Sequence, residues 1–171
     1  DSLYGANMTI LNKESADPFE PAELNAITQR IEDGVSLMTY FGHSTATASG
    51  FEINLDEPQN WNNSGKYHLM LVNSCYNGNI FQPGNSKSED FVQLPGAGAI
   101  GYIASVSVGF DTYLYWYSRE LYRQFSYNNY GATVGKQMQE TIRNFEGQSW
   151  MVSTTNQMTL NGDPMLSINS H

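Results

Sequence analysis

Three short apolar runs stand out along the chain, each followed at once by polar residues or glycine. They cover residues 35–41, 67–72 and 97–104. Runs of this length without a strict polar alternation predict strands that are buried on both faces of a parallel sheet. The segments between and after the runs carry helical spacing or turn residues. The pattern therefore predicts an α/β domain with a mainly parallel sheet and helices on both of its faces.

Capping residues and apolar spacing predict the helices. Asp17-Pro18-Phe19-Glu20 indicates a helix start, and Gly34 indicates its end. Ser86 and Glu89 form a second capping box, which opens a helix expected to run through Phe91 and Leu94. Two more helices are expected near residues 112–125 and 133–145. Their core-facing stripes would be Leu114, Tyr117, Leu121 and Phe125 on the first helix, and Val134, Met138, Thr141 or Ile142, and Phe145 on the second.

The front of the chain offers little regular structure. Before the first helix it has at most one short strand, Met8 to Leu11, although a doubly wound sheet needs more strand–helix units there. No internal repeat, low-complexity segment or linker is visible, so residues 1–171 are expected to form a single domain. The chain opens at Asp1 without an initiator Met or a signal-peptide pattern. We expect an excised or processed piece, the C-terminal part of a larger catalytic domain.

Composition narrows the class of partner. The chain has 171 residues, of which 40% are hydrophobic and 13% aromatic, as in a folded domain with a sizeable core. Eight basic and seventeen acidic residues give a net charge of −9, which argues against a nucleic-acid partner. No apolar run approaches the roughly 20 residues of a membrane-spanning helix, so no span is expected.

Three residues whose side chains could take part in catalysis follow the three predicted strands: His43, Cys75 and Ser105. Ligands bind beyond the carboxyl ends of parallel strands, so these residues are expected at one edge of the sheet. Cys75 is the only cysteine, which excludes an internal disulfide, and a lone cysteine is often just a small buried apolar residue. His43 likewise could be structural. Their joint placement favours a cysteine peptidase, which needs a thiolate nucleophile, an imidazole acid/base and backbone N–H groups for the oxyanion.

Four motifs carry a family resemblance. They are Tyr40-Phe41-Gly42-His43-Ser44, Asn73-Ser74-Cys75-Tyr76-Asn77-Gly78, the run from Gly96 to Ser105, and Leu160-Asn161-Gly162-Asp163-Pro164-Met165-Leu166. Their order and spacing, from about Ala16 to Ile168, resemble the gingipain-type cysteine peptidases, peptidase family C25 of the caspase-like clan. The resemblance implies a caspase-like fold.

The resemblance also implies roles for individual residues. Cys75 would be the nucleophile and His43 the general acid/base. The oxyanion hole would be formed by the backbone N–H groups of Cys75 and Ser44, with Gly42 in the same loop. The segment after the third strand would line the substrate pocket.

That pocket is expected to include Ser105, Val106 and Ser107, with Asp111 and Phe51 nearby. Ser105 and Ser107 would offer backbone contacts. Asp111 could hold a basic side chain, or it could simply cap the helix that it precedes.

The chain departs from the family pattern at three places. Ser44 stands where relatives usually have glycine, and it would be strained if the loop needs a positive φ. Phe51 stands where relatives often have Trp. The acid that orients the histidine lies upstream in the family, and Glu14 and Asp17 are the only early candidates here.

Other polar residues carry weaker hypotheses. Glu52, Asp56 and Glu57 could bind a cation such as calcium, but their spacing matches no calcium loop and a solvated acidic face explains them as well. No other cofactor or metal is expected. Asp163-Pro164 predicts a turn that closes the domain. His68 and His171 have no plausible ligand partners.

The leading hypothesis is a secreted or cell-surface cysteine endopeptidase domain of gingipain type, from a Bacteroidetes-like bacterium, acting on polypeptide through an acyl-enzyme. The remaining N-terminal part of the catalytic domain would be its partner. A sortase-like transpeptidase of a protein secretion system is a close variant, since an amine can replace water. A non-catalytic caspase-like surface or assembly module is the main alternative. A flavodoxin-like nucleotide binder is disfavoured, because no Gly-rich phosphate loop follows a strand at a helix start.

Overall fold

The fold is built on one mixed sheet. The structure is a computed structural model that describes residues 7–12, 21–47 and 57–168. The strand order is β1-β2-β3-β4, in which the first three strands are parallel and the last is antiparallel to β3. The bounds are Leu37–Phe41 for β1, His68–Asn73 for β2, Ala99–Ser105 for β3 and Met158–Gly162 for β4. The three predicted parallel strands are therefore confirmed. The expectation that all three are buried on both faces is wrong for β1, which is the edge strand of the described sheet and leaves Thr39 and Phe41 exposed.

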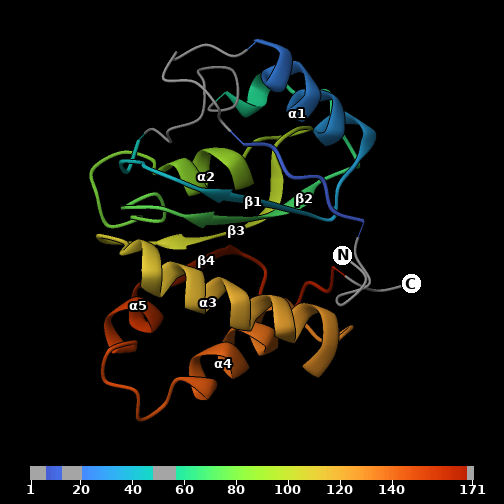
Figure 1. The fold of residues 1–171 in the computed structure, drawn as a ribbon. Coiled ribbons are helices and arrows are strands. Elements are labelled where there is room, and N and C mark those ends of the chain that lie inside the picture. Colours follow the sequence, from blue (N-terminus) through green and yellow to red (C-terminus); the bar gives the residue numbers. More distant parts are fainter. Residues whose placement is uncertain (1–6, 13–20, 48–56, 169–171) are drawn as a thin grey trace.

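Helices cover both faces of the sheet (Figure 1). α1 (Pro21–Asp33) and α2 (Lys87–Val92) lie on one face. α3 (Asp111–Arg123), α4 (Val134–Asn144) and α5 (Val152–Gln157) lie on the other. Two short turns complete the described elements: the 3-10 turn η2 (Pro58–Asn60) and the π-helical turn η3 (Gln124–Asn128), which extends α3. The expected α/β architecture is confirmed.

The central strand β2 is buried on both sides. Leu69 and Leu71 belong to the core cluster under α3, α4 and α5, whereas Met70 and Val72 belong to the cluster on the α1 and α2 side. None of these four side chains is exposed to solvent. A strand that is buried on both faces has a nearly continuous apolar sequence, which explains why the sequence predicts β2.

The capping signals also work as predicted. Ser86 accepts a hydrogen bond from the Glu89 backbone N–H, and the Glu89 carboxylate accepts from the Ser86 backbone N–H. Gly34 has φ of 102° and its N–H reaches the Arg30 carbonyl at 3.1 Å, so it ends α1. α2 stops at Val92, short of the expected Leu94. Leu94 precedes Pro95, and a residue before proline is disfavoured in a helix. The predicted start Asp17–Glu20 lies outside the described residues.

Most of the predicted helical stripes face the core. Leu114, Tyr117 and Leu121 of α3 and Val134 and Met138 of α4 are buried. Phe125 is also buried, but it lies in the π-helical turn after α3 has ended.

The expected strands need correction near the start and the end of the chain. The short strand Met8 to Leu11 does not form, and Met8 and Ile10 are exposed by 57% and 66%. No strand of the described sheet pairs with this segment. Conversely, β4 was not expected, because its five residues are mostly half-buried and give no continuous apolar run.

The predicted turn at Asp163-Pro164 is confirmed, and it caps a helix. The Asp163 carboxylate accepts the Met165 N–H at 2.8 Å. The next carbonyls accept the first N–H groups of α4: Val134 N–H reaches Leu166 at 2.7 Å, and Gly135 N–H reaches Pro164 at 2.9 Å. The chain after β4 thereby satisfies helix donors that would otherwise lack partners. Across the described ranges, no helix is both long and apolar enough to cross a bilayer.

Candidate active site

The loops that follow β1, β2 and β3 meet at one edge of the sheet, on the left of Figure 1. Their sequences contain His43, Cys75 and the segment from Ser105 to Phe110. Parallel strands place their carboxyl ends at the same edge, so three segments distant in sequence come together here. This edge is the candidate active site.

The loop of His43 and the loop of Cys75 are joined by three hydrogen bonds. Gly42 N–H donates to the Asn73 carbonyl at 3.1 Å. The Ser44 hydroxyl donates to the Cys75 carbonyl at 2.5 Å. The Asn77 amide donates to the Thr45 carbonyl at 3.2 Å. The two residues flanking His43 and one residue beyond them are therefore fixed to the loop that carries the thiol.

The loop after β3 contacts the thiol itself. Cys75 is half-buried, and its Sγ accepts the Gly109 backbone N–H at 3.4 Å. The same sulfur lies 3.7 Å from the Gly109 carbonyl oxygen. A Cβ on Gly109 would lie 2.5 Å from Leu114 and 2.8 Å from the Ser74 carbonyl, so only glycine fits this close approach.

The predicted pocket segment lies against the cysteine loop. Tyr76 N–H donates to the Ser107 carbonyl and Gly78 N–H donates to the Ser105 carbonyl, both at 2.9 Å. The Ser105 hydroxyl folds the segment by accepting the Ser107 N–H at 3.2 Å. Val106 N–H binds the Gln157 carbonyl at 2.9 Å, which attaches the segment to the end of α5.

Backbone strain is found beside the cysteine and not beside the histidine. Tyr76 has φ of 58°, and among the described residues it is the sole non-glycine in the left-handed region. Ser44 is outside that region, so the strain considered for a serine in the glycine position does not arise. Strained residues of this kind concentrate at functional sites.

His43 is exposed, and its loop is held by its backbone. Tyr40 donates from its hydroxyl to the His43 carbonyl at 3.0 Å. The Tyr40 ring lies where a Cβ on Gly42 would be, since that atom would sit 2.3 Å from the Tyr40 oxygen. Within residues 21–47 and 57–168, no carboxylate hydrogen bonds to the His43 imidazole. The proposed orienting acids Glu14 and Asp17 lie outside the described residues.

The remaining predicted residues contribute less to this edge. Asp111 is exposed and is the first residue of α3, not its N-cap, which is Phe110. Its carboxylate accepts the Thr112 N–H at 2.6 Å, so it binds the first turn of its own helix. Phe51, Glu52 and Asp56 lie outside the described residues. Glu57 accepts a hydrogen bond from the Asn60 amide at 2.8 Å.

Asn77 is a site residue to which sequence reasoning assigned no role. It is fully buried, and its side chain donates to Thr45 while it accepts from the Tyr102 hydroxyl. One amide thus joins the loop after β1, the loop after β2 and strand β3. The sequence offered only a turn signal, Asn77-Gly78, and partners so distant in sequence cannot be read from it.

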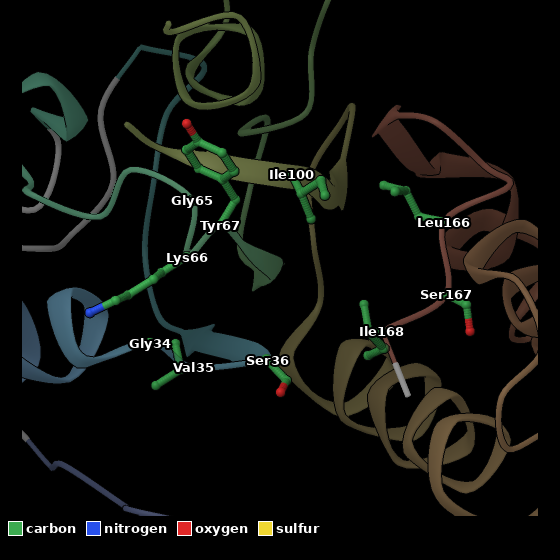
Figure 2. A pocket seen from close by; sticks show the side chains of 10 residues that line it. All are labelled: Gly34, Val35, Ser36, Gly65, Lys66, Tyr67, Ile100, Leu166, Ser167 and Ile168. Atoms are coloured by element: carbon green, nitrogen blue, oxygen red, sulfur yellow. The ribbon is translucent and has the colours of Figure 1, made fainter. Parts of the chain in front are cut away.

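The hollow shown in Figure 2 is at the opposite edge of the sheet. It is lined by residues that precede β1 and β2 in the chain, such as Ser36 and Tyr67, by Ile100 near the start of β3, and by Leu166 and Ile168 near the end. Lys66 points away from it in Figure 2 and donates to the Glu32 carbonyl at 2.7 Å. Its lining contains neither a cysteine nor a histidine, so the pair that a cysteine peptidase needs is not found there.

Comparison with known proteins identifies relatives of this arrangement. The family model described as peptidase family C25 matches residues 2–169. The crystal structure of the Arg-specific cysteine proteinase gingipain R is similar with a TM-score of 0.68 and 22% identity, covering 84% of this chain and 35% of that chain. The complex of Porphyromonas gingivalis RgpB pro- and mature domains has the same TM-score, 0.68, with 20% identity and coverage of 84% and 36%.

A third structure, described only as that of a protease, has a TM-score of 0.68 and 17% identity over 80% of this chain and 36% of that one. The chain thus spans about a third of the length of the solved structures that it matches. At these identities the likeness shows a common fold. No curated protein matches the chain.

Proposed function

The chain belongs to peptidase family C25, and from this premise we propose that it is the part of a gingipain-type cysteine endopeptidase that carries Cys75 as nucleophile and His43 as general acid/base. The observation that supports the proposal most is the joining of the two loops: the Ser44 hydroxyl, next to His43, donates to the carbonyl of Cys75 at 2.5 Å. Loops held in this way keep an imidazole and a thiol at the same edge of the sheet.

The proposed reaction has two steps. The Cys75 thiolate attacks the carbonyl carbon of a peptide bond, the C–N bond breaks, and His43 gives its proton to the leaving amine. A thioester then joins Cys75 to the acyl half of the substrate. Water attacks the thioester, His43 accepts the proton of that water, and the carboxylic acid and free thiolate are released.

The backbone N–H of Cys75 is proposed as an oxyanion donor. No residue in the described part of the chain accepts a hydrogen bond from it. The N–H of Ser44, in the loop that begins at Gly42, would be the second donor. Oxyanion donors of this kind stabilise the charge that develops on the carbonyl oxygen in the transition state.

The substrate pocket is proposed at the segment Ser105, Val106 and Ser107, which lies against the cysteine loop through the Tyr76 and Gly78 N–H groups. Phe51 and a basic-side-chain role for Asp111 stay predictions. The proposed partners are a polypeptide substrate and the remaining N-terminal part of the catalytic domain. Support for the second comes from the solved structures that the chain matches, since it covers only 35% and 36% of those chains. A secreted or surface location is proposed from the same family membership.

Product analysis tests the proposal. The full-length protein is incubated with a mixed peptide library, and new termini are identified by mass spectrometry, with Cys75→Ala as the control. We expect new carboxyl termini that Cys75→Ala does not produce. With an added glycine amide, products extended by that amine would indicate transpeptidation instead of hydrolysis. If wild type and Cys75→Ala give the same products, the chain has no peptidase role of its own.

A further inference from the structure

Four aromatic rings form a row that begins beside the thiol. Gly109 donates its N–H to Cys75 Sγ, and Phe110 is the next residue. The Phe110 ring packs edge-on against Tyr113 at 5.9 Å between centroids. Tyr113 lies 5.8 Å from Trp150, and Trp150 lies 6.2 Å from Phe145. The row therefore runs from the candidate nucleophile along the start of α3 to the segment between α4 and α5.

The row ends in a groove between α3 and that segment. Trp150 and Phe145 line one side of the groove, and Trp116, Arg119 and Arg123 of α3 line the other. The hollow has a volume of about 350 Å³. The start of α3 and the chain before α5 lie on the same side of the molecule as the loops of the candidate site (Figure 1).

Much of this apolar surface is open to solvent. Phe110 is exposed by 58%, Trp150 by 43% and Trp116 by 37%. The Phe110 and Trp150 rings are joined through Tyr113, and Trp116 lines the same groove as Trp150. Exposed apolar patches mark binding surfaces. Trp, Tyr and Arg are also the residues that dominate the binding free energy of protein interfaces.

The charges of the groove favour an acidic group on the ligand. Arg123 pairs with Glu120 at 3.2 Å, and the Glu120 carboxylate also accepts from Gln124 and Asn144, so this acid is saturated. Arg119 sits 5.0 Å from the centre of the Trp116 ring and has no carboxylate partner within the described residues. A guanidinium fixed over an indole ring is prepared to bind a carboxylate by two hydrogen bonds.

We propose that the row Phe110, Tyr113, Trp150 and Phe145, with the groove at Arg119, is an extended binding surface for the polypeptide substrate. It holds a stretch of unfolded chain that continues beyond the scissile bond, with apolar side chains on the rings and an Asp or Glu side chain on Arg119. The inference depends on the proposed peptidase function and adds the substrate class: unfolded segments that combine large apolar and acidic residues.

A binding measurement tests this inference without turnover. Fluorescently labelled β-casein, an unfolded and acidic protein, is titrated onto the full-length protein carrying Cys75→Ala, and anisotropy gives the Kd. We expect Trp150→Ala and Arg119→Gln each to raise the Kd at least tenfold. Tyr127→Ala is the matched control, since Tyr127 is 80% exposed and its ring contacts none of the row.

Three outcomes would overturn the inference. They are no binding of casein by the Cys75→Ala protein, an equal Kd in Trp150→Ala and Tyr127→Ala, or unchanged Kd together with faster limited proteolysis of the row variants. The last outcome would assign the row to contact with another domain of the same protein. Failure of the peptidase proposal is seen separately, as Cys75 alkylation by iodoacetamide that does not depend on His43.

Discussion

The Ser44 hydroxyl donates a hydrogen bond to the backbone carbonyl of Cys75 at 2.5 Å. A glycine, the usual residue after the histidine in the family that the chain resembles, could not make this bond. Because Ser44 is adjacent to His43 and its φ is not positive, the serine adds a link between the two loops without visible backbone strain. Ser44, which departs from the family pattern, therefore links the two loops at the proposed active site.

Removal of this hydroxyl is expected to loosen the site. Ser44→Ala loses a hydrogen bond worth about 1 kcal/mol, and the proposed peptidase activity should fall by about fivefold. Ser44→Thr keeps the hydroxyl and should stay near wild type. The measurement is kcat/KM on a peptide identified from the library. Equal activity of the Ala and Thr variants would show that the bond does not position the loops.

The buried amide of Asn77 is expected to contribute to stability as well as to position. Asn77→Ala removes both hydrogen bonds of a fully buried amide, the one from the Tyr102 hydroxyl and the one to the Thr45 carbonyl, so the free energy of unfolding should fall by about 1–3 kcal/mol. The matched control is Asn156→Ala, an exposed position in α5, which should change it by less than about 0.5 kcal/mol. Urea unfolding of both variants makes the comparison. Similar losses in the two would contradict the assigned role of Asn77.

The sequence predicts those parts of the fold that depend on local patterns or on interactions between residues close in sequence. β2 and β3 could be predicted because burial on both faces gives each strand a nearly continuous apolar run. The capping box at Ser86 could be predicted because its partner, Glu89, is three residues away. β4 was missed because its five residues are mostly half-buried and carry no such run.

The site divides in the same way. His43, Cys75 and Ser105 could be placed at one edge from topology alone. The hydrogen bonds between the loops that carry these residues, such as that from Asn77 to Thr45, link positions about thirty residues apart in sequence. No local sequence pattern predicts such bonds. The close approach of Gly109 to the thiol also depends on how the loops fold, and no local sequence pattern around Gly109 predicts it.

Two glycines, Gly96 and Gly98, allow the cost of a positive φ to be measured separately from the cost of steric crowding. Gly96 and Gly98 both have positive φ, 84° and 89°. A Cβ on Gly96 would meet open space, whereas a Cβ on Gly98 would lie 2.2 Å from the Phe91 carbonyl oxygen. Gly96→Ala should therefore cost about 1 kcal/mol and Gly98→Ala several times more. Thermal or urea unfolding of both variants tests this. Equal losses would contradict the close packing of α2 on β3.

His68 is expected to make stability depend on pH. Burial lowers the pKa of His68 from 6.5 to about 4. Between these values the unfolded chain binds a proton that the folded chain does not, so the free energy of unfolding falls as the pH is lowered from 6.5 to 4. The full effect is on the order of 3 kcal/mol.

Urea unfolding at pH 7, 5.5 and 4.5 measures the slope. His68→Leu should flatten it in this window, whereas His43→Ala, at an exposed position, should keep it. Carboxylates such as Glu140, whose pKa is lowered by hydrogen bonds from Lys136 and Arg143, lose their contribution only at lower pH. A slope that is the same in all three proteins would show that His68 titrates normally.

The central claim is that Cys75 and His43 act together, and the rate of alkylation of Cys75 tests it most directly. The full-length protein is treated with a peptidyl acyloxymethyl ketone across pH 5 to 9, and the labelled residue is identified by mass spectrometry. We predict saturable labelling of Cys75 that is faster than that of free cysteine and falls at least a hundredfold in His43→Ala, with Tyr127→Ala unchanged. If Cys75 reacts no faster than free cysteine, or equally fast without His43, the proposed dyad does not exist.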